Sequence, residues 1–223
     1  MSMQNETKSQ KKSCIRRFFG MFKDSALEFK STRNLVLCAM MAALSIVLSY
    51  TTSFYITPEI KIGFSGLPNR LVDFMFGPVV GCIFGGLMDV IKFFIKPDGA
   101  FFPGYTLTAM VGGLIYGIFY YRLQIKTPQI TTETGWPKVK AWILANITSI
   151  LLIFIANVLV KFICNIGLNT LWSSMFTGKA WIALLPTRVG KNLIQIPVDT
   201  VLHFVLIKLF CQLRRYLLPN NGR

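Results

Sequence analysis

The sequence lacks the residues and motifs on which most enzymes depend. It has 223 residues but a single histidine, His203, and only nine acidic residues. It contains neither a G-x-x-x-x-G-K-[ST] phosphate-binding loop nor an H-E-x-x-H metal motif, which argues against ATP hydrolysis and a catalytic metal. Its five cysteines are scattered, without a C-x-x-C pair, and predict no disulfide framework. We therefore expect a protein that is not an enzyme, with no cofactor and no metal.

Charge is also scarce. Only 15% of the residues are charged and 53% are hydrophobic, whereas an average soluble domain carries roughly 25% charged residues. The apolar residues form blocks about as long as a crossing of the hydrocarbon core, roughly 30 Å. The net charge of +15 lies beside these blocks, which fits membrane topology rather than nucleic-acid binding. The composition predicts an all-α integral membrane protein of the cell membrane.

The apolar blocks predict a bundle of six transmembrane helices. Gly77-Pro78 divides the long block 67–95 into two short helices, because proline removes a backbone donor and disfavours helix in the residue before it. Lys and Arg cluster before the first span, between the fourth and fifth, and after the last. Six spans place all three clusters, and both termini, in the cytoplasm. The other expected spans are about 34–52, 105–121, 141–163 and 180–209, with outer loops at 53–66, 96–104 and 165–179.

The chain divides into three expected regions. Residues 1–33 form a polar cytoplasmic tail, 34–210 the membrane domain and 211–223 a basic cytoplasmic tail. Within the first tail, residues 14–30 place aromatic and basic side chains on opposite sides of a helix. This spacing predicts an amphipathic helix lying on an anionic leaflet. The alternative is a simple basic flank of the first span.

The sixth expected span carries a stripe of polar side chains. It consists of Arg188, Asn192, Gln195 and Asp199, with Lys191 at its edge. Charge inside a span is costly, so such residues face the bundle interior or a wet cavity. Near the outer end, Arg188, Lys191 and Asn192 suit a ligand with carboxylates and polar edges. For Asp199, deeper in the span, we expect an internal pair with a basic residue of another helix.

A second polar set lies in the short hairpin of helices, and aromatic residues crowd the outer loops. Arg70 and Asp73 are one helical turn apart, as are Asp89 and Lys92, so each pair can form an ion pair, and Arg70 can alternatively touch ligand. The aromatic residues form either an interfacial belt or a surface that stacks on a flat ligand ring. The candidate substrate-binding residues are Arg188, Lys191, Asn192, Gln195, Arg70, Asn69, Asp73, Phe102, Tyr105 and Asn165.

Small residues recur at four-residue spacing in three of the expected spans. Such faces let two helices approach closely. The pairs or triplets are Ala39 and Ala43, Gly81 and Gly85, and Ala109, Gly113 and Gly117. We expect the two glycine faces to pack within the bundle, and the alanine face to meet another protein.

These motifs together resemble a known family. The A-x-x-x-A of the first span, F-G-P-V-V-G at the second turn and the loop P-D-G-A-F-F-P-G-Y-T-L-T-A are similar to the substrate-binding S components of energy-coupling factor (ECF) vitamin transporters. The resemblance extends over about residues 31–216. L-P-N-R-L-V-D-F-M-F-G-P-V-V-G and F-F-P-G-Y-T-L-T-A-M-V-G-G-L-I-Y-G look most like the folate-specific members.

The resemblance implies a six-helix bundle whose outward cavity binds a vitamin. It also implies docking onto a membrane-embedded coupling protein that carries two cytoplasmic ATPases, whose ATP hydrolysis topples the bundle and releases the vitamin inside. The family's alanine motif maps onto Ala39 and Ala43, and its gating loop onto about residues 52–66. A folate ligand would present two carboxylates to Arg188 and Lys191, and a flat pterin ring to the aromatic residues.

Three alternatives stay open at this point. The first is an S component for another vitamin, such as riboflavin, thiamine or a queuosine precursor. The second is a ligand-free membrane scaffold or assembly protein, which predicts a polar stripe neutralised by internal pairing. The third is a membrane enzyme, which the single histidine and the missing motifs disfavour.

Overall fold

The structure is a computed structural model that describes residues 18–51, 53–57, 60–95, 101–121, 123, 125, 136–178 and 180–217. After a helix at residues 18–28, the elements run in the order α2 (Thr32–Thr51), β1 (Ser53–Thr57), β2 (Ile60–Gly63), the 3₁₀ turn Phe64–Gly66, α3 (Leu67–Phe76), α4 (Pro78–Ile95), α5 (Pro103–Tyr120), α6 (Trp136–Val160), the π-helical stretch Lys161–Leu168, α7 (Asn169–Thr177) and α8 (Trp181–Leu217).

Several of these helices are long and apolar enough to cross a membrane. Among the described residues four segments meet this criterion: Thr32–Thr51, Pro78–Ile95, Leu144–Met175 and Leu185–Gln212. With 10 residues, α3 is about 15 Å long and reaches halfway through the hydrocarbon core of roughly 30 Å. The predicted helical membrane architecture is therefore confirmed at the level of class.

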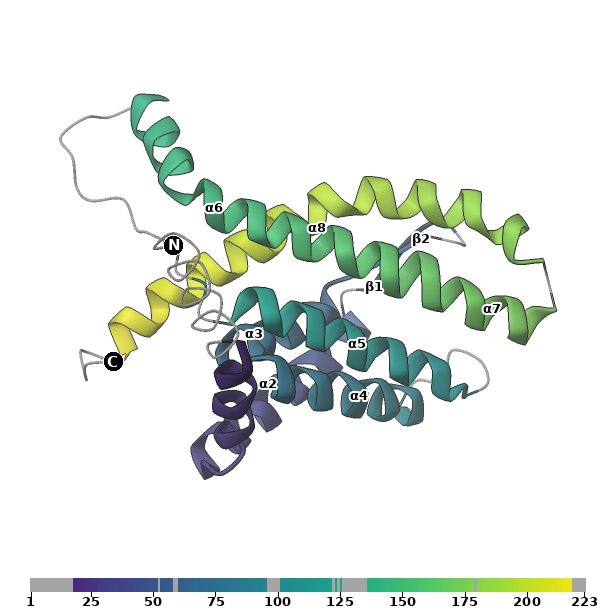
Figure 1. The fold of residues 1–223 in the computed structure, drawn as a ribbon, viewed down its shortest axis with the longest axis horizontal. Helices are drawn as coiled ribbons and strands as arrows, with labels where there is room; N and C mark the ends of the chain where they lie inside the picture. The colour runs from purple at the N-terminus through teal and green to yellow at the C-terminus, as the bar shows by residue number, and fades with distance from the viewer. Residues whose placement is uncertain are drawn as a thin grey trace, which may run out of the picture.

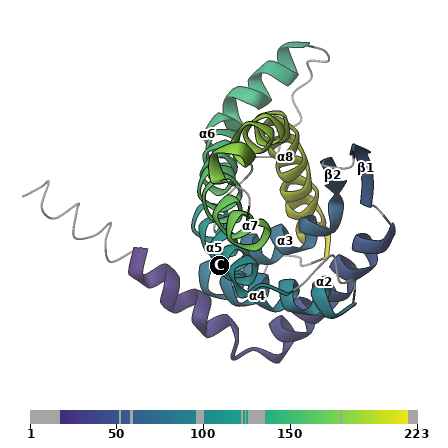
Figure 2. The ribbon, with the colours of Figure 1, turned by 90° about the vertical axis from the view of Figure 1, so that its right-hand side faces the viewer.

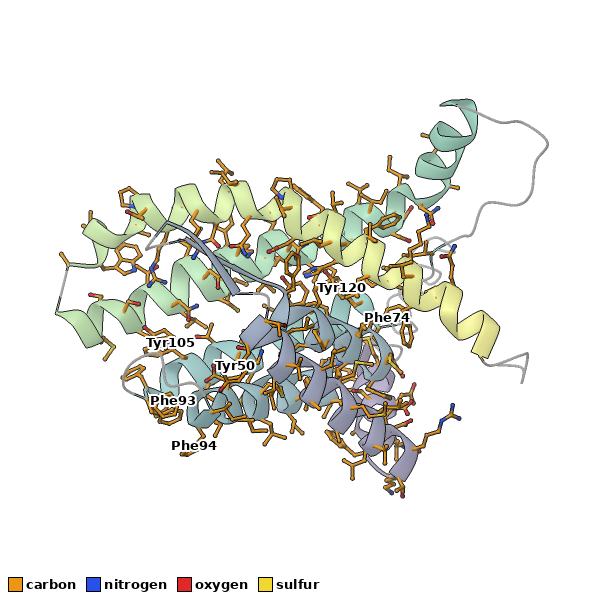
Figure 3. All side chains as sticks on the ribbon, turned by 180° about the vertical axis from the view of Figure 1, so that it is seen from behind. Tyr50, Phe74, Phe93, Phe94, Tyr105 and Tyr120 are labelled. Atoms are coloured by element: carbon orange, nitrogen blue, oxygen red, sulfur yellow. The ribbon has the colours of Figure 1, made fainter. Side chains whose placement is uncertain are left out.

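The helices α4, α5, α6 through α7, and α8 lie side by side and share two ends, while the helix at residues 18–28 runs across them (Figure 1). The start of α4, the end of α5 and the end of α8 lie at one end, and the end of α7 and the start of α8 lie at the other. Viewed from the second end, α7 and α8 lie across from α4, and the β1–β2 hairpin lies beside α8 and α2 (Figure 2). In Figure 3, Phe74 and Tyr120 lie towards the first end and Tyr105 towards the second. Both Phe74 and Tyr120 belong to the larger of two buried apolar clusters.

The break at Gly77-Pro78 is confirmed. The last residue of α3 is Phe76, α4 begins at Pro78, and Gly77 between them has φ 85°, a conformation that glycine adopts without a steric penalty. A Cβ at this position would lie 2.9 Å from the Tyr121 ring. The turn therefore requires glycine both for its backbone angle and for its space.

A serine from the N-terminal helix caps this turn. Ser25 is completely buried, and its Oγ donates to the carbonyl of Phe76 at 2.6 Å. The same oxygen accepts from the backbone N–H groups of Val79 at 3.1 Å and Val80 at 3.3 Å. The first N–H groups of a helix have no partner within it, so Ser25 caps α4 from another part of the chain.

The segment between α2 and α3 differs from the predicted loop. It forms a two-stranded antiparallel sheet in which Ser53 pairs with Gly63 and Phe54 with Ile62. The register shifts between Tyr55 and Thr57, which marks an irregularity in β1. The β-branched and aromatic residues of S-F-Y-I-T and I-K-I-G favour strands. The prediction of an all-α fold is therefore corrected to a helical fold that includes one short β-hairpin.

The predicted outer loop at 165–179 is wrong over most of its length. The helix that begins as α6 continues through the π-helical stretch Lys161–Leu168 and through α7 to Thr177. It ends at Gly178, which has φ 67° and donates its N–H to the Ser174 carbonyl, the arrangement of a glycine C-cap. A π-helical turn absorbs an irregularity without ending a helix, and Asn165 and Gly167 lie within this stretch.

The last helix is longer than predicted. With 37 residues, α8 includes both Pro186 and Pro197 and continues to Leu217. Its length of about 55 Å exceeds the hydrocarbon thickness. Prolines are tolerated within spans because neighbouring groups satisfy the freed backbone atoms, and here they do not end the helix.

The glycine faces of α4 and α5 pack against each other, as predicted. A Cβ on Gly113 would lie 2.2 Å from the Gly81 carbonyl oxygen, and one on Gly117 would lie 2.4 Å from the Pro78 Cα. Likewise, a Cβ on Gly85 would lie 2.7 Å from the Ala109 carbonyl oxygen. The two backbones are in direct contact, which is how small residues join helices in a membrane.

Substitution of Gly113 tests this contact. Gly113→Ala places a methyl group against the backbone of α4, and overpacking of this kind costs about 1–3 kcal/mol. We expect a lower free energy of unfolding, measured by chemical or thermal unfolding in detergent. The matched control is Gly112→Ala, because a Cβ on the neighbouring Gly112 would meet Cys164 and Val160 at an ordinary 3.9 Å. Equal effects of the two variants would contradict the close packing.

Candidate functional site

Polar side chains form a ladder between the α6–α7 helix and α8. On the first helix they recur at every fourth residue, so they share one face. The rungs are Asn157 Nδ2 to Thr200 Oγ1 at 3.0 Å, Lys161 Nζ to Asp199 Oδ2 at 2.7 Å, Asn165 Nδ2 to Asn192 Oδ1 at 3.1 Å, and Ser173 Oγ to Arg188 Nη2 at 2.6 Å. These pairs hold the two helices in one register.

The ladder is joined to α5 at the rung that lies nearest the second end of the bundle, which we call its outer end. The hydroxyls of Tyr105 and Ser173 are 2.9 Å apart, so one serine contacts both α5 and Arg188 of α8. One residue earlier, Trp172 donates its indole N–H to Thr108 Oγ1 at 3.1 Å. A layer of hydroxyl, indole and guanidinium groups therefore connects three helices near the second end of the bundle.

Aromatic rings flank this layer. The Phe102 ring lies 5.6 Å from the Trp172 ring and 6.0 Å from the Tyr105 ring, centroid to centroid. The rings approach so closely because residue 104 is glycine: a Cβ there would lie 2.6 Å from Trp172 and 2.5 Å from Phe102. Such a group of rings provides flat apolar surface beside hydrogen-bonding groups, the usual composition of a small-molecule site.

A second charged group lies deeper in the bundle. Arg70 Nη1 and Asp73 Oδ2 are 2.7 Å apart, and the Arg70 guanidinium lies over the Tyr116 ring at 3.8 Å from its centroid. Tyr116 in turn donates to Asn157 Oδ1 at 2.8 Å. The predicted Arg70–Asp73 ion pair is confirmed, and it connects α3 and α5 to the innermost rung of the ladder.

The structure brings half of the predicted site residues together at the outer end of the ladder. These are Arg188, Asn192, Asn165, Phe102 and Tyr105. Lys191 and Gln195 are half-buried on the same helix. Lys191 lies within electrostatic reach of Arg188 and of Lys161, whose own charge is paired with Asp199.

The other predicted residues lie elsewhere. Arg70 and Asp73 form the deeper pair described above. Asn69 lies near α2, where the buried Ser45 donates to its Oδ1 at 3.2 Å and to the Ser65 carbonyl at 2.6 Å. The predicted internal pairing of Asp199 is confirmed by Lys161. Lys92 donates to the Ser65 carbonyl at 3.2 Å, and Asp89 accepts from Thr106 at 2.8 Å.

Sequence reasoning missed several members of this polar network. They are Tyr116, Asn157, Lys161, Asn169 and Ser173. The signal was present, since Asn157, Lys161, Asn165, Asn169 and Ser173 recur at every fourth position. It was hidden because the helix was expected to end at residue 163.

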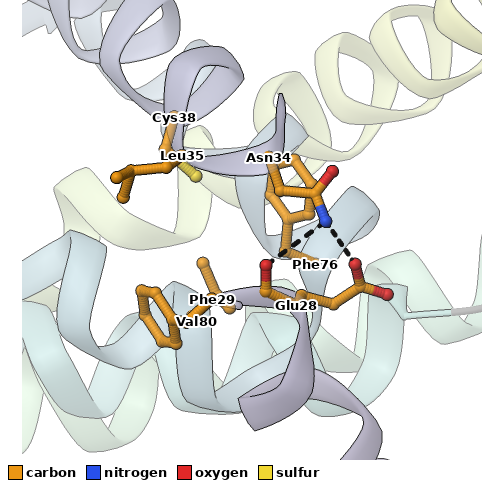
Figure 4. A pocket seen from close by; sticks show the side chains of 7 residues that line it. All are labelled: Glu28, Phe29, Asn34, Leu35, Cys38, Phe76 and Val80. Atoms are coloured by element: carbon orange, nitrogen blue, oxygen red, sulfur yellow. Dashed lines mark hydrogen bonds between the residues drawn. The ribbon is translucent and has the colours of Figure 1, made fainter. Parts of the chain in front are cut away.

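A small pocket lies at the first end of the bundle, far from the aromatic layer (Figure 4). Its lining includes Glu28, Asn34 and Phe76, and Asn34 Nδ2 donates to the Glu28 backbone carbonyl at 3.3 Å and to its carboxylate. Its volume of about 10 Å³ is at the lower limit for one water molecule. This pocket is too small for a vitamin.

Within the part of the chain that the structure describes, no three His, Cys, Asp or Glu side chains lie together in a way that suits a metal ion. The groups available at the outer layer are cations, amides, hydroxyls and aromatic rings. They suit the noncovalent binding of a small anionic or polar molecule that has a flat ring.

Comparison with known proteins supports the assignment as a helical membrane protein whose polar interior suits a small molecule. This assignment is made more specific by a family model. A family model described as ECF transporter, substrate-specific component matches residues 33–207. The chain is 34% identical over 172 residues to the folate transporter FolT of Clostridium novyi (strain NT), covering 77% of this chain and 86% of that protein. It is 33% identical over 181 residues to the folate transporter FolT of Leuconostoc mesenteroides subsp. mesenteroides, covering 79% and 85%.

A solved structure is similar as well. The crystal structure of FolT bound with folic acid aligns with a TM-score of 0.59 and 28% sequence identity, covering 79% of this chain and 93% of that chain. The chain belongs to the family of ECF transporter substrate-specific components. It is therefore a multi-pass membrane protein of a transporter family rather than of a catalytic one.

The Lys161–Asp199 pair, in which the lysine is buried and the aspartate partly buried, allows a test of the ladder. Lys161→Met leaves a partly buried carboxylate without its partner, and since breaking a fully buried pair costs about 3–5 kcal/mol, this cost is an upper bound. We expect a correspondingly lower free energy of unfolding, measured in detergent. The double variant Lys161→Met/Asp199→Leu should recover most of the loss, while Lys30→Met, at an exposed lysine, should have little effect. A double variant as unstable as Lys161→Met would contradict the ion pair.

Proposed function

We propose that the protein is the high-affinity substrate-binding subunit of an ATP-driven ECF importer and that its substrate is folate. The observation that carries the choice of ligand is the outer layer itself, where Arg188 donates to Ser173, whose hydroxyl meets that of Tyr105 beside the aromatic rings, and where Lys191 lies within electrostatic reach of Arg188. Folate has two carboxylates and a flat pterin ring, which match these groups. Two relatives named as folate transporters, and a similar structure that contains folic acid, support the same ligand.

Each predicted site residue has a proposed role. Arg188 and Lys191 bind the carboxylates, because a guanidinium and an ammonium form charge-assisted hydrogen bonds with them. Phe102 and Tyr105 stack against the ring, with Trp172 behind Phe102. The remaining candidates supply polar contacts or the floor of the site: Asn165, Asn192, Gln195, Asn69, Arg70 and Asp73.

For the topology we propose six membrane-embedded helical segments with both termini in the cytoplasm. The segments are α2, α3, α4, α5, α6 through α7, and α8, with α3 reaching only partway across. The helix at residues 18–28 contacts the α3–α4 turn through Ser25, at the end of the bundle where α8 also finishes (Figure 1). Lys and Arg before α2 and near the end of α8 then lie on one side, as the positive-inside rule requires.

A partner surface is proposed on α2. Ala39 and Ala43 are exposed, and Met40 between them is 62% exposed. Ser45 is the buried residue of this helix, so most of α2 presents apolar surface outward. We assign the alanine face to the membrane-embedded coupling protein, which would carry the two cytoplasmic ATPases that hydrolyse ATP.

The segment 52–66 is proposed as the gate of the site. It contains the β1–β2 hairpin, which lies beside α8 and α2 (Figure 2). The base of the hairpin is held at the Ser65 carbonyl by Ser45 of α2 and Lys92 of α4. Because only the end that follows β2 is held by these bonds, we propose that the hairpin moves as a unit while its two strands stay paired.

Loss of the Arg188 side chain tests the ligand site. Arg188→Ala removes the guanidinium that we assign to a carboxylate, and we expect the dissociation constant of folic acid to rise about 10-fold or more, which equals about 1.4 kcal/mol. Isothermal titration calorimetry on the purified full chain measures this. Arg33→Ala, at an exposed arginine outside the site, is the control. An unchanged constant in Arg188→Ala would remove Arg188 from the site.

The identity of the substrate is tested independently by mass spectrometry of the ligand that co-purifies from rich medium. We expect a folate. Riboflavin, thiamine or a queuosine precursor would reassign the substrate within the same family. A protein that retains no ligand and binds none of these compounds would favour a scaffold role.

Substitution of the alanine face tests docking. Ala39→Leu/Ala43→Leu fills the surface against which another helix would pack closely, so we expect loss of co-purification with the coupling protein while folic acid binding is kept. Val201→Leu/Val205→Leu is the matched control, since both valines are exposed on α8 with the same spacing. If the alanine double variant still co-purified with the coupling protein, the assignment of this face to docking would be wrong.

A further inference from the structure

Three asparagine side chains form a relay of hydrogen bonds beside the candidate site. Asn192 Nδ2 donates to the Arg188 backbone carbonyl at 2.8 Å, Asn165 Nδ2 donates to Asn192 Oδ1 at 3.1 Å, and Asn169 Nδ2 donates to Asn165 Oδ1 at 3.3 Å. The relay begins on α8, passes through the π-helical stretch and ends on the first residue of α7.

The direction of the relay is fixed chemically. The Arg188 carbonyl can only accept, so the amide nitrogen of Asn192 must face it and leave Oδ1 as its acceptor. Asn165 must then donate to that oxygen, and Asn169 must donate to the oxygen of Asn165. An asparagine flip anywhere in the relay would set two oxygens or two nitrogens against each other. The last group of the relay is therefore Asn169 Oδ1, an acceptor.

This terminal acceptor has no donor among the residues that the structure describes. Among the described residues Asn169 Oδ1 is the buried side-chain oxygen or nitrogen for which no hydrogen-bond partner exists. Buried polar atoms in native proteins are nearly always hydrogen-bonded, and an exception calls for an explanation. The rest of the side chain is not free to turn away, because its Nδ2 is held by Asn165.

The position of Asn169 places this acceptor beside the layer of polar groups formed by Ser173, Arg188 and Tyr105. Asn165 and Ser173 lie one turn before and one turn after Asn169 on the same helical face. Both of these neighbours bond to α8, Asn165 through Asn192 and Ser173 through Arg188. Ser173 also contacts Tyr105 of α5. Asn169 thus lies between two rungs that consist largely of candidate ligand-binding residues.

We propose that Asn169 Oδ1 accepts a hydrogen bond from an N–H group on the ring of the bound ligand, and so selects for a heterocycle that carries an amino or lactam N–H. The proposal rests on the proposed function. The cations Arg188 and Lys191 recognise acceptors and anions only, whereas Asn169 supplies the opposite polarity. A site with a buried acceptor strongly rejects an analogue that lacks the matching donor, because the acceptor is then left unpaired.

The test compares three ligands on the wild-type full chain and two variants. The ligands are folic acid, an analogue whose ring amino group is replaced by methyl, and an analogue methylated at the lactam nitrogen. The variants are Asn169→Leu, which removes the acceptor with little change of volume, and Thr170→Val as control. Thr170 is the buried neighbour of Asn169, and its hydroxyl donates to the Asn165 backbone carbonyl at 3.4 Å. Dissociation constants are measured by calorimetry, and monodispersity and melting temperature verify folding.

The expected pattern is a coupling between residue 169 and one ring donor. Wild-type protein should bind folic acid about 10-fold or more tightly than at least one analogue. In Asn169→Leu the binding of folic acid should weaken by a similar factor, and the preference over that analogue should fall towards one. Thr170→Val should keep the wild-type preference.

Four results would overturn the inference. Equal wild-type affinity for all three ligands would show that no ring donor is recognised, whatever the folding of the variants. An unchanged affinity of Asn169→Leu for folic acid, or an equal loss for all three ligands, would leave Asn169 a solvent-bound or structural side chain while the folate assignment stands. Absence of folic acid binding to the wild type would overturn the proposed function, and this inference with it.

Discussion

The pairing of polar side chains between the α6–α7 helix and α8 is the constraint on which the rest of the structure depends. An amide or charge inside an apolar bundle is costly unless a partner meets it, so each rung fixes how far one helix can slide past the other. Lys161–Asp199 holds the middle of the ladder, and Ser173–Arg188 holds its outer end. Because the rungs fix the register of the two helices, the rings of Phe102, Tyr105 and Trp172 beside them keep their relative positions. The opposite wall is set differently, by backbone contact between Gly81 of α4 and Gly113 of α5.

The two halves of the bundle are therefore held together by different interactions, backbone contact in one and side-chain hydrogen bonds in the other. Direct backbone contact between α4 and α5 leaves no room for a ligand, and it makes this pair a rigid support. The α6–α7 and α8 pair is joined by side chains, which hold the helices while leaving hydrogen-bonding groups available between them. Tyr116 links the two halves, since it lies under Arg70 and donates to Asn157. Most of the proposed binding groups thus lie on the half that has side chains at its interface.

Much of the fold followed from local sequence. The apolar blocks, the Gly77-Pro78 break and the glycine faces are short-range signals, and the structure has helices and contacts where they predict them. The end of the fifth span was not predictable in this way. Asn165, Gly167 and Asn169 have low helix preference, yet the helix continues through all three. Asn165 lies in the π-helical stretch and donates to Asn192 of α8, and Asn169 at the start of α7 donates to Asn165. The hairpin at 53–63 was also missed as an element, because strands this short depend on pairing that local composition does not specify.

The candidate site was predictable only in part. The polar stripe of α8 has a clear helical period, so Arg188 and Asn192 were identified from spacing alone, and Asn165, the partner of Asn192, was also a candidate. Ser173, the partner of Arg188, and Asn169 lay beyond an expected helix end and were missed. The partner of Asp199 was predictable in kind, as a basic residue, but its identity as Lys161 required the relative register of two helices. Register between distant segments is information that a single sequence does not display.

The Ser25 cap has a consequence for where the folded unit begins. The α3–α4 turn borrows its capping hydroxyl from a residue made more than fifty positions earlier. A truncation at residue 34, at the start of the apolar part, would therefore remove a group that belongs to the interior of the bundle. Ser25 precedes α4 in the chain, so this cap can form only after Val79 and Val80 have been synthesised. The helix at residues 18–28 is in this sense a structural part of the α3–α4 turn.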